Sequence, residues 1–538
     1  MKLAYILPVL GVTLMLGMSS CSKFLDVDPE SKIPGDKVFS DINSTNAYVL
    51  GLYDTWREGH KARVDPYLGT DEAISGGFQH DDFERRGLDE YAEGMNSTNG
   101  KILSIWTNRY QIISRSAPAI QELKRLEAQG NPELNKMLGE ASLLRAVSMW
   151  ELSQYFGSIP VIDHDKPELG GNRQPLDVVY TAIEEDLLNA EKYLPDPSAI
   201  SDPRRASKAL AQAMLGKLFL YAPASSGMRD YEKAKGYFKK VIDNPYFGTT
   251  GASNFAIIFN AEAENETNYK REMIYAFQYK AGYPNQSSAQ WDVGSRAVAQ
   301  MTPVEAIAPW SGFDGMMASE YCYGTVANGG VWEAGDLRKD ESIRYDFTWN
   351  GYTPNLRGWA WGDELEPHIK KYEDLRIVAL GQSTWHSGKS IPFIRFSDVV
   401  LNYAECLYFT GQQAEGISLI NNVVRKRAFG GTLPAGMEWS TGMGTDDFLT
   451  HLLDERMREL CFEGWRKFDL LRTGKLIEYV TARNRWVKAG NFVNIEGVVR
   501  DLGATKVIPA HRLLWPIPLE ELRQNPDLDE SKDQNPGY

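Results

Sequence analysis

Apolar residues recur at helical spacing along both flanks of this chain, and the spacing is lost in the middle. Residues that repeat every three or four positions share one face of an α-helix, so such a segment buries one side and exposes the other. In the first flank the pattern covers 47–56, 106–120, 144–155, 179–194, 210–221 and 231–241. The sequence therefore predicts a mostly α fold.

The pattern is most regular between Phe396 and Ala428, where Gly411 separates two apolar stripes. Ala404 and Gly416 are small residues on these stripes, and they allow two helices to approach closely. Such a pair is typical of tetratricopeptide repeats, whose pairs stack into a solenoid with a continuous core. Because longer stretches join the earlier helices, we expect a degenerate, tetratricopeptide-like solenoid of helical pairs.

Between 244 and 394 the helical period is absent, and Gly, Pro, Asn and aromatic residues dominate. A structureless loop of this length is improbable, so we expect a folded, irregular insertion. Tryptophan is costly to leave in water, and a cluster of it forms either a small core or a binding surface. Six of the fourteen tryptophans lie between positions 291 and 361 of this stretch, namely Trp291, Trp310, Trp332, Trp349, Trp359 and Trp361.

The first residues have the composition of a lipoprotein export signal. Lys2 is followed by an apolar run and then by Ser19-Ser20-Cys21. The run is too short for an ordinary membrane span. We therefore expect Cys21 to be acylated, with an ordinary secretory signal as the alternative, and a lipid anchor as the only membrane attachment. The predicted regions are a signal at 1–20, helical regions at 21–243 and 395–538, and a ligand-binding insertion at 244–394.

Charge and motifs exclude several classes of function. The formal charge is −14 and no block of Lys and Arg occurs, which argues against binding nucleic acid. Zincin, nucleophile-elbow, phosphate-loop and Cys-x-x-Cys motifs are absent, so neither an enzymatic activity nor a cofactor is predicted. Asp163-His164-Asp165 is only a thin hint of calcium, because position five of a calcium loop would fall on Pro167. Cys406 and Cys461 lie on apolar patterns and are predicted core residues.

Three carboxylates follow one another at helical spacing near the C-terminus. Glu455, Glu459 and Glu463 stand at i, i+4 and i+8, on one face of a helix. Such a row could form a metal or acid–base site. Arginines are interleaved with it, however, so we expect a salt-bridge network that fixes the helix against the solenoid.

The same segment carries a family resemblance. Residues 455–474, ERMRELCFEGWRKFDLLRTG, resemble the long helix motif of the SusD/RagB family, although Cys461 stands where that family usually has alanine. The segment CSKFLDVDP from Cys21 is similar to the family's mature start. The tail from Trp515-Pro516-Ile517-Pro518 to the final Asn-Pro-Gly-Tyr is similar to its terminus. These matches anchor both ends, so the resemblance covers nearly the whole chain.

The resemblance implies a nutrient-uptake lipoprotein of the Bacteroidetes outer membrane, exposed at the cell surface. Such proteins bind oligosaccharides, or peptides in some branches, and act as a lid on a SusC-like TonB-dependent transporter. Two other classes stay open. A surface glycoside hydrolase needs only two carboxylates, and a tetratricopeptide scaffold could bind protein alone.

Sugar rings expose flat patches of C–H that match an indole face. Covering roughly 40–60 Å² of C–H gives only about 1–1.5 kcal/mol, so a glycan site needs several platforms with polar groups between them. Burial in a small core stays the alternative for each tryptophan, and a solvated loop is the alternative for the stretch near Asp71. The predicted ligand contacts are Trp291, Trp310, Trp332, Trp359, Trp361, Asp71, Phe78 and Gln79.

Overall fold

The computed structural model describes residues 38–39, 41–61, 64–76, 80–127, 130–162, 171–294, 301–302, 312–349, 366–381, 384–493, 499–501 and 503–538. The chain divides into two compact units, Met1–Tyr48 and Val49–Tyr538. In the first unit the described residues include the start of α3 (Ile42–Glu58), and the Phe39 ring packs edge-on against Tyr48 at 5.2 Å. Cys21 and the segment Asp163-His164-Asp165 lie outside the described residues.

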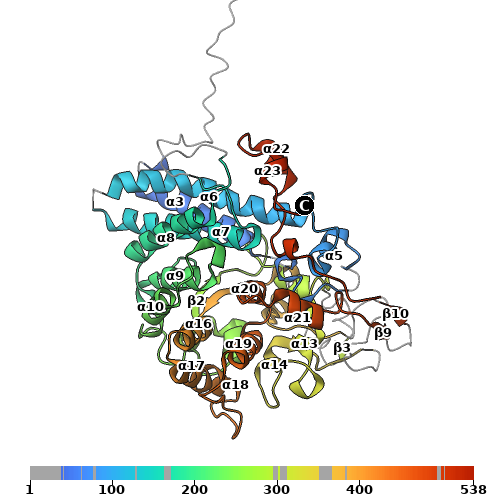
Figure 1. Ribbon diagram of the computed structural model, residues 1–538. Coiled ribbons are helices and arrows are strands. Elements are labelled where there is room, and N and C mark those ends of the chain that lie inside the picture. The colour runs from blue at the N-terminus through green and yellow to red at the C-terminus, as the bar shows by residue number, and fades with distance from the viewer. Residues whose placement is uncertain are drawn as a thin grey trace, which may run out of the picture. The chain divides into compact units, whose positions relative to one another are not determined.

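Successive helices of the second unit pack against one another (Figure 1). Local sequence explains where they begin and end. Asn131 caps α7 through its side chain and is followed by Pro132, and Gly157 ends the same helix with φ +74°. Asp230 caps α10. These helices are α6 (Gly100–Glu127), α7 (Pro132–Phe156), α8 (Leu176–Tyr193), α9 (Lys208–Tyr221) and α10 (Tyr231–Ile242).

The helical array continues across the middle of the chain, because α10 packs on α16 (Phe396–Phe409). Helix α16 in turn packs on α17 (Gln413–Leu419), which runs through the π-helix η11 (Ile420–Arg425) into α18 (Lys426–Ala428). A Cβ on Gly416 would lie 2.5 Å from the Ala404 carbonyl oxygen, so the predicted close approach is confirmed. The mostly α fold is confirmed as well, and the pairwise packing agrees with a tetratricopeptide-like arrangement.

The middle of the chain leaves and rejoins this array at one place. Strand β2 (Met273–Phe277) pairs antiparallel with β8 (Ile391–Arg395), so the segment between them is closed at its base. Three further antiparallel pairs involve this segment: β1 (Ala73–Ile74) with β4 (Met317–Ala318), β3 (Met301–Thr302) with β6 (Thr348–Trp349), and β5 (Ile343–Arg344) with β7 (His368–Ile369). Its short helices are α12 (Ala289–Val293), α13 (Glu320–Tyr323), α14 (Arg338–Ser342) and α15 (Arg376–Ala379), and α11 (Thr267–Lys270) directly precedes β2. The domain borders at 244 and 394 stay predictions.

One expectation for the C-terminal region is wrong. The motif expected as one long helix is divided into α19 (Thr445–Leu460) and α20 (Arg466–Arg472). Between them Phe462 and Gly464 adopt φ +64° and +89°, and the Tyr67 ring lies 3.3 Å from where a Gly464 Cβ would stand. The remaining elements are α5 (Phe83–Glu90), α21 (Leu476–Arg483), β9 (Asn491–Val493), β10 (Val499–Asp501), α22 (Leu519–Gln524) and α23 (Glu530–Asp533).

The carboxylate row forms the predicted salt-bridge network, but mostly with other partners than the interleaved arginines. Glu459 is fully buried and pairs with Arg427 at 2.6 Å and Arg395 at 2.9 Å. Glu455 pairs with Arg338 at 2.7 Å. The network therefore ties α19 to α14, to the end of β8 and to the helical hairpin. Cys406 and Cys461 are buried, as predicted.

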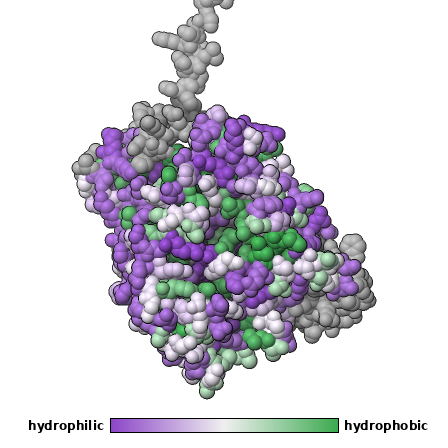
Figure 2. All heavy atoms as spheres, viewed as in Figure 1, coloured by the Kyte–Doolittle hydropathy of each residue, from purple (hydrophilic) through white to green (hydrophobic). Residues whose placement is uncertain are grey.

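The surface in Figure 2 is mainly hydrophilic over α8, α9 and α10, and apolar side chains gather in a patch near the centre of the view, over the region of α20 and α21 in Figure 1. Across the described part of the chain, helices fall short of the length and apolar character that crossing a membrane requires.

Candidate functional site

A stack of three aromatic rings lies on the segment between β2 and β8. Trp291, in α12, packs on Phe313 with ring centroids 4.5 Å apart and on Trp385 with centroids 3.6 Å apart, and both pairs are nearly parallel. Trp385, in η10 (Thr384–His386), is 47% exposed. The stack therefore ends in an indole that is supported from within and open to solvent.

Backbone hydrogen bonds fix the three segments that carry these rings. Phe313 N–H donates to the Trp291 carbonyl at 2.8 Å, and Ser287 N–H donates to the Ser387 carbonyl at 2.8 Å. The close approach depends on glycine, since a Cβ on Gly312 would lie 1.9 Å from the Gly294 carbonyl oxygen. Backbone hydrogen bonds and the close contact between Gly294 and Gly312 therefore hold the three stacked rings in place.

Tyr283 adds a second exposed ring beside the stack. It is 84% exposed at the tip of a turn that is closed by the Lys280 N–H to Asn285 carbonyl bond of 2.8 Å. Gly282 N–H in the same turn donates to the His386 carbonyl at 3.2 Å, so the turn adjoins the segment with Trp385. We call Tyr283, Trp291, Phe313 and Trp385 the aromatic face.

Polar side chains accompany the aromatic face. Gln290 is buried, and neither polar atom of its amide has a hydrogen-bond partner among the described residues. Asp292 accepts a 2.9 Å bond from the Ser288 hydroxyl, and burial raises the pKa of Asp292 to about 6. Arg85 lies over the Phe313 ring at 5.7 Å and pairs with Asp65 at 2.8 Å. Amide, carboxyl and guanidinium groups beside stacked rings match the needs of a ligand with hydroxyl groups.

Two of the predicted contacts belong to the protein interior, so their prediction as exposed ligand contacts is wrong. Trp332 is 1% exposed, and its indole N–H donates to the Cys322 carbonyl. Asp71 is fully buried and pairs with Arg466 at 2.7 Å and with Arg483 at 2.8 Å. Burial acts to raise the pKa of Asp71, but the two guanidinium groups hold it below its usual value.

The other predicted contacts have different outcomes. Trp291 lies in the aromatic face, where it is half-buried and forms the middle ring of the stack. The remaining ones, Trp310, Trp359, Trp361, Phe78 and Gln79, lie outside the described residues. The sequence analysis missed Tyr283, Phe313 and Trp385. A lone tryptophan between Ser, Thr and Gly residues, as in Ser383-Thr384-Trp385-His386-Ser387-Gly388, was the available signal for Trp385.

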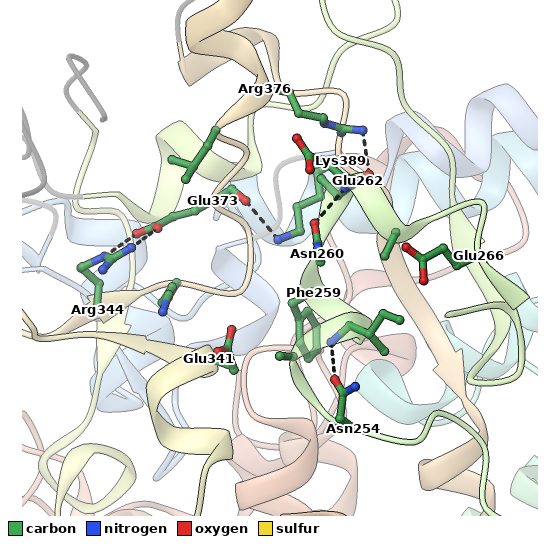
Figure 3. A pocket seen from close by; sticks show the side chains of 16 residues that line it. Asn254, Phe259, Asn260, Glu262, Glu266, Glu341, Arg344, Glu373, Arg376 and Lys389 are labelled. Atoms are coloured by element: carbon green, nitrogen blue, oxygen red, sulfur yellow. Dashed lines mark hydrogen bonds and ion pairs between the residues drawn. The ribbon is translucent and has the colours of Figure 1, made fainter. Parts of the chain in front are cut away.

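A pocket of about 580 Å³ opens between residues 254–266, which precede β2, and another part of the segment between β2 and β8 (Figure 3). Its lining is rich in charged side chains, including Glu341, Arg344, Glu373, Arg376 and Lys389. The described residues contain no group of three or more His, Cys, Asp or Glu side chains placed to hold a metal ion. The charged lining of the pocket can therefore bind a ligand through hydrogen bonds and ion pairs.

Comparisons with known proteins agree with this architecture. A model of the SusD family matches residues 323–538, and a model described as starch-binding associating with outer membrane matches residues 23–220. The second description confirms the predicted outer-membrane location.

Relatives and solved structures extend the match over almost the whole chain. SusD-like protein P2 of Formosa agariphila is 26% identical, with 98% of each chain covered. Starch-binding protein SusD of Bacteroides thetaiotaomicron is 24% identical over 77% of this chain and 75% of its own. A laminarin binding SusD-like protein has the same fold, with a TM-score of 0.68 at 23% identity, covering 92% of this chain and 99% of its own. The chain belongs to the SusD family.

Proposed function

We propose that this protein is a cell-surface lipoprotein that captures oligosaccharides and delivers them to a SusC-like TonB-dependent transporter, on which it acts as a lid. Family membership supports this role, as do the names of two similar proteins, one starch-binding and one laminarin binding. The lipid on Cys21 would keep the binding protein at the membrane surface beside its transporter. A peptide or another nutrient in the same role is the alternative.

The observation that carries the proposal is the half-exposed Trp385 stacked on Trp291. A ring that is held flat from behind can meet the C–H face of a sugar without losing side-chain freedom on binding. One such contact gives only about 1–1.5 kcal/mol, so Tyr283 and neighbouring polar groups must add to it. Trp310, Trp359 and Trp361 belong to the same insertion and remain proposed contacts, as do Phe78 and Gln79.

Binding without catalysis is part of the proposal. Purified protein titrated with a panel of soluble polysaccharides, including starch and laminarin, should bind at least one of them. Chromatography of the same mixtures after prolonged incubation should find no shortened products. Release of oligosaccharides would favour the glycoside hydrolase alternative. Failure to bind any polysaccharide, with binding of peptides, would favour the peptide alternative.

The lid role predicts a partner that the chain itself does not supply. Purification in mild detergent should recover a TonB-dependent barrel in about equal amount with this protein. Quantitative mass spectrometry of the purified material measures that ratio. Recovery of the lipoprotein alone, from membranes that contain the barrel, would contradict the lid role while leaving glycan binding intact.

A further inference from the structure

The charged pocket in Figure 3 is separate from the aromatic face, and it lies between residues 254–266, which precede β2, and residues of the segment between β2 and β8. Its walls come from η5 (Ala256–Phe259), η6 (Ala261–Ala263), α14, β5 and residues 370–376. Phe259 contributes an apolar surface, and the volume of about 580 Å³ is within the range of small-molecule sites. A sugar unit or two fits a space of this size.

The two guanidinium groups in the wall are already neutralised by ion pairs. Arg344 donates to Glu373 at 2.9 Å and to Asp346 at 2.7 Å. Arg376 pairs with Asp374 at 2.8 Å. These pairs form a rigid frame. Because both guanidinium groups already have carboxylate partners, a ligand anion would gain little by binding to them.

Lys389 differs from the other charged groups that line the pocket without an ion pair in the described part of the chain, because Glu262 and Glu266 are exposed and Glu341 and Lys370 are half-buried, whereas Lys389 is buried. Its side chain is part of a residue only 5% exposed, and its ammonium donates to the Glu373 carbonyl at 3.0 Å. Among the described residues it makes no ion pair. The carboxylates of Glu373, Asp374 and Glu264 stabilise this charge, but only from beyond ion-pair distance. A buried ammonium whose hydrogen-bond acceptor is neutral is still costly, and an anion in direct contact with it would offset that cost. Burial lowers the pKa of Lys389 to about 8, which leaves the group mostly charged at neutral pH.

Hydroxyl-binding groups surround the same space. The side-chain oxygens of Asn254 and Asn260 accept 3.0 Å bonds from backbone N–H groups, so their amide NH₂ groups remain as donors. Glu341, which reaches toward the pocket in Figure 3, makes no ion pair within the described part of the chain and can accept from hydroxyls. Besides the buried Lys389 ammonium, the lining holds two amide donors, the Lys370 ammonium and the carboxylates of Glu262, Glu266 and Glu341, which suit a ligand that carries one anionic group and several hydroxyls.

We propose that this pocket binds a negatively charged sugar unit, a uronate or a sulfated sugar, with the Lys389 ammonium as the contact to its anionic group. The inference rests on the proposed function, since it assumes that the protein captures glycans. It adds that the captured glycan is acidic. A neutral sugar would use the amides and Glu341 but would leave Lys389 without an anionic group in direct contact.

The chain connects this pocket to the aromatic face. Lys389 follows Trp385 by four residues, a span of at most about 14 Å even when fully extended. The Asp374 carboxylate holds the connecting segment in place, accepting from Ser387 Oγ at 3.1 Å and from Gly388 N–H at 3.0 Å. The backbones of Trp385 and Lys389 therefore lie within the length of a short oligosaccharide.

The test uses matched pairs of ligands that differ only in charge. Oligogalacturonate, oligomannuronate and a hyaluronan oligosaccharide are each titrated beside the carboxyl-reduced form, and a carrageenan oligosaccharide beside its desulfated form. Calorimetry compares wild type with Lys389→Met, Lys389→Arg and the control Lys426→Met, which removes an exposed positive charge elsewhere. Thermal melts accompany each variant, and Lys389→Met should melt no lower than wild type because it removes a buried charge.

We expect wild type to prefer at least one acidic ligand over its neutral form by tenfold or more. Lys389→Met should reduce that preference to less than threefold, whereas Lys389→Arg and Lys426→Met should keep it. The uronate and sulfate pairs identify which anion is taken. No preference for any acidic ligand, or an undiminished preference in Lys389→Met, would overturn the inference. Binding of the neutral forms to wild type tests the glycan-capture role separately, so the two failures are distinguishable.

Discussion

At the scale of single residues, tryptophans of the same segment have opposite surroundings. Trp332 is 1% exposed and bonded through its indole N–H, whereas Trp385 is 47% exposed and rests on another ring. Burial of a large aromatic ring is the commoner outcome, and a tryptophan left open at the surface needs a reason. In this protein the supported, open ring is the one fit to contact a ligand.

The buried tryptophan gives the first prediction. Trp332→Ala should lower the free energy of unfolding by about 3–5 kcal/mol, because it leaves a cavity and an unpaired Cys322 carbonyl. Urea unfolding followed by circular dichroism measures the change. Glycan affinity of the folded variant should stay within about twofold of wild type. A variant that is as stable as wild type but binds glycans more weakly would contradict this prediction and would indicate that Trp332 contacts the ligand.

At the scale of elements, the flanking helices could be predicted and the site could not. The apolar pattern at 231–241 matches α10, which covers Tyr231–Ile242, because a helix that buries one face carries its own periodic signal. The aromatic face has no such signal. Trp291, Phe313 and Trp385 are brought together by backbone pairing between segments distant in the sequence, which leaves no local period.

Helix α19 shows what a sequence pattern could predict in this chain and what it could not. The spacing of Glu455, Glu459 and Glu463 predicted a salt-bridge network, which the structure contains, but it also predicted an unbroken helix. Left-handed φ angles at Phe462 and Gly464 end the helix before Glu463. The buried partners Arg395 and Arg427 come from other elements, so their pairing depends on tertiary packing.

This network makes the fold sensitive to acid. Burial opposes ionisation of Glu459, but Arg427 and Arg395 lower its pKa to about 2, below the value near 4.3 of an unfolded chain. The folded state therefore binds fewer protons, and its stability is present above about pH 4 and lost as pH falls toward 2. The loss from this one group is on the order of 3 kcal/mol.

Urea unfolding midpoints of wild type and Glu459→Gln at pH 7, 4 and 3 measure this dependence. Wild type should lose stability steeply between pH 4 and pH 3. Glu459→Gln should be less stable at pH 7, since it leaves buried guanidinium groups without a counter-charge, and it should lose less on acidification. Equal losses in the two proteins would mean that Glu459 is not held ionised by its arginines.

At the scale of the whole molecule, we propose that binding and transport are divided between two proteins. In this proposal the chain supplies the binding surface and a lipid anchor, and a TonB-dependent barrel supplies the channel. The outer-membrane association of the family agrees with this division. The helical array formed by both flanks provides a rigid body from which the segment between β2 and β8 presents the aromatic face.

The anchor gives a prediction at this scale. Cys21→Ala should abolish acylation and move the protein from the membrane to the soluble fraction. A single alkyl chain holds a protein only weakly at a membrane, so several chains on one N-terminus are needed for stable attachment. Fractionation with immunoblotting measures the distribution, and mass spectrometry of the mature N-terminus reports the lipid. Unchanged membrane association of the variant would contradict the lipid-anchor prediction.

The central claim, that the aromatic face captures glycans, is tested most directly by calorimetric titration of Trp385→Ala with a polysaccharide that wild type binds. Loss of one stacking platform should cost roughly 1–2 kcal/mol, about a five- to thirtyfold weaker affinity. The melting temperature should stay nearly unchanged, because Trp385 is 47% exposed. An affinity equal to that of wild type in a fully folded Trp385→Ala protein would contradict the claim.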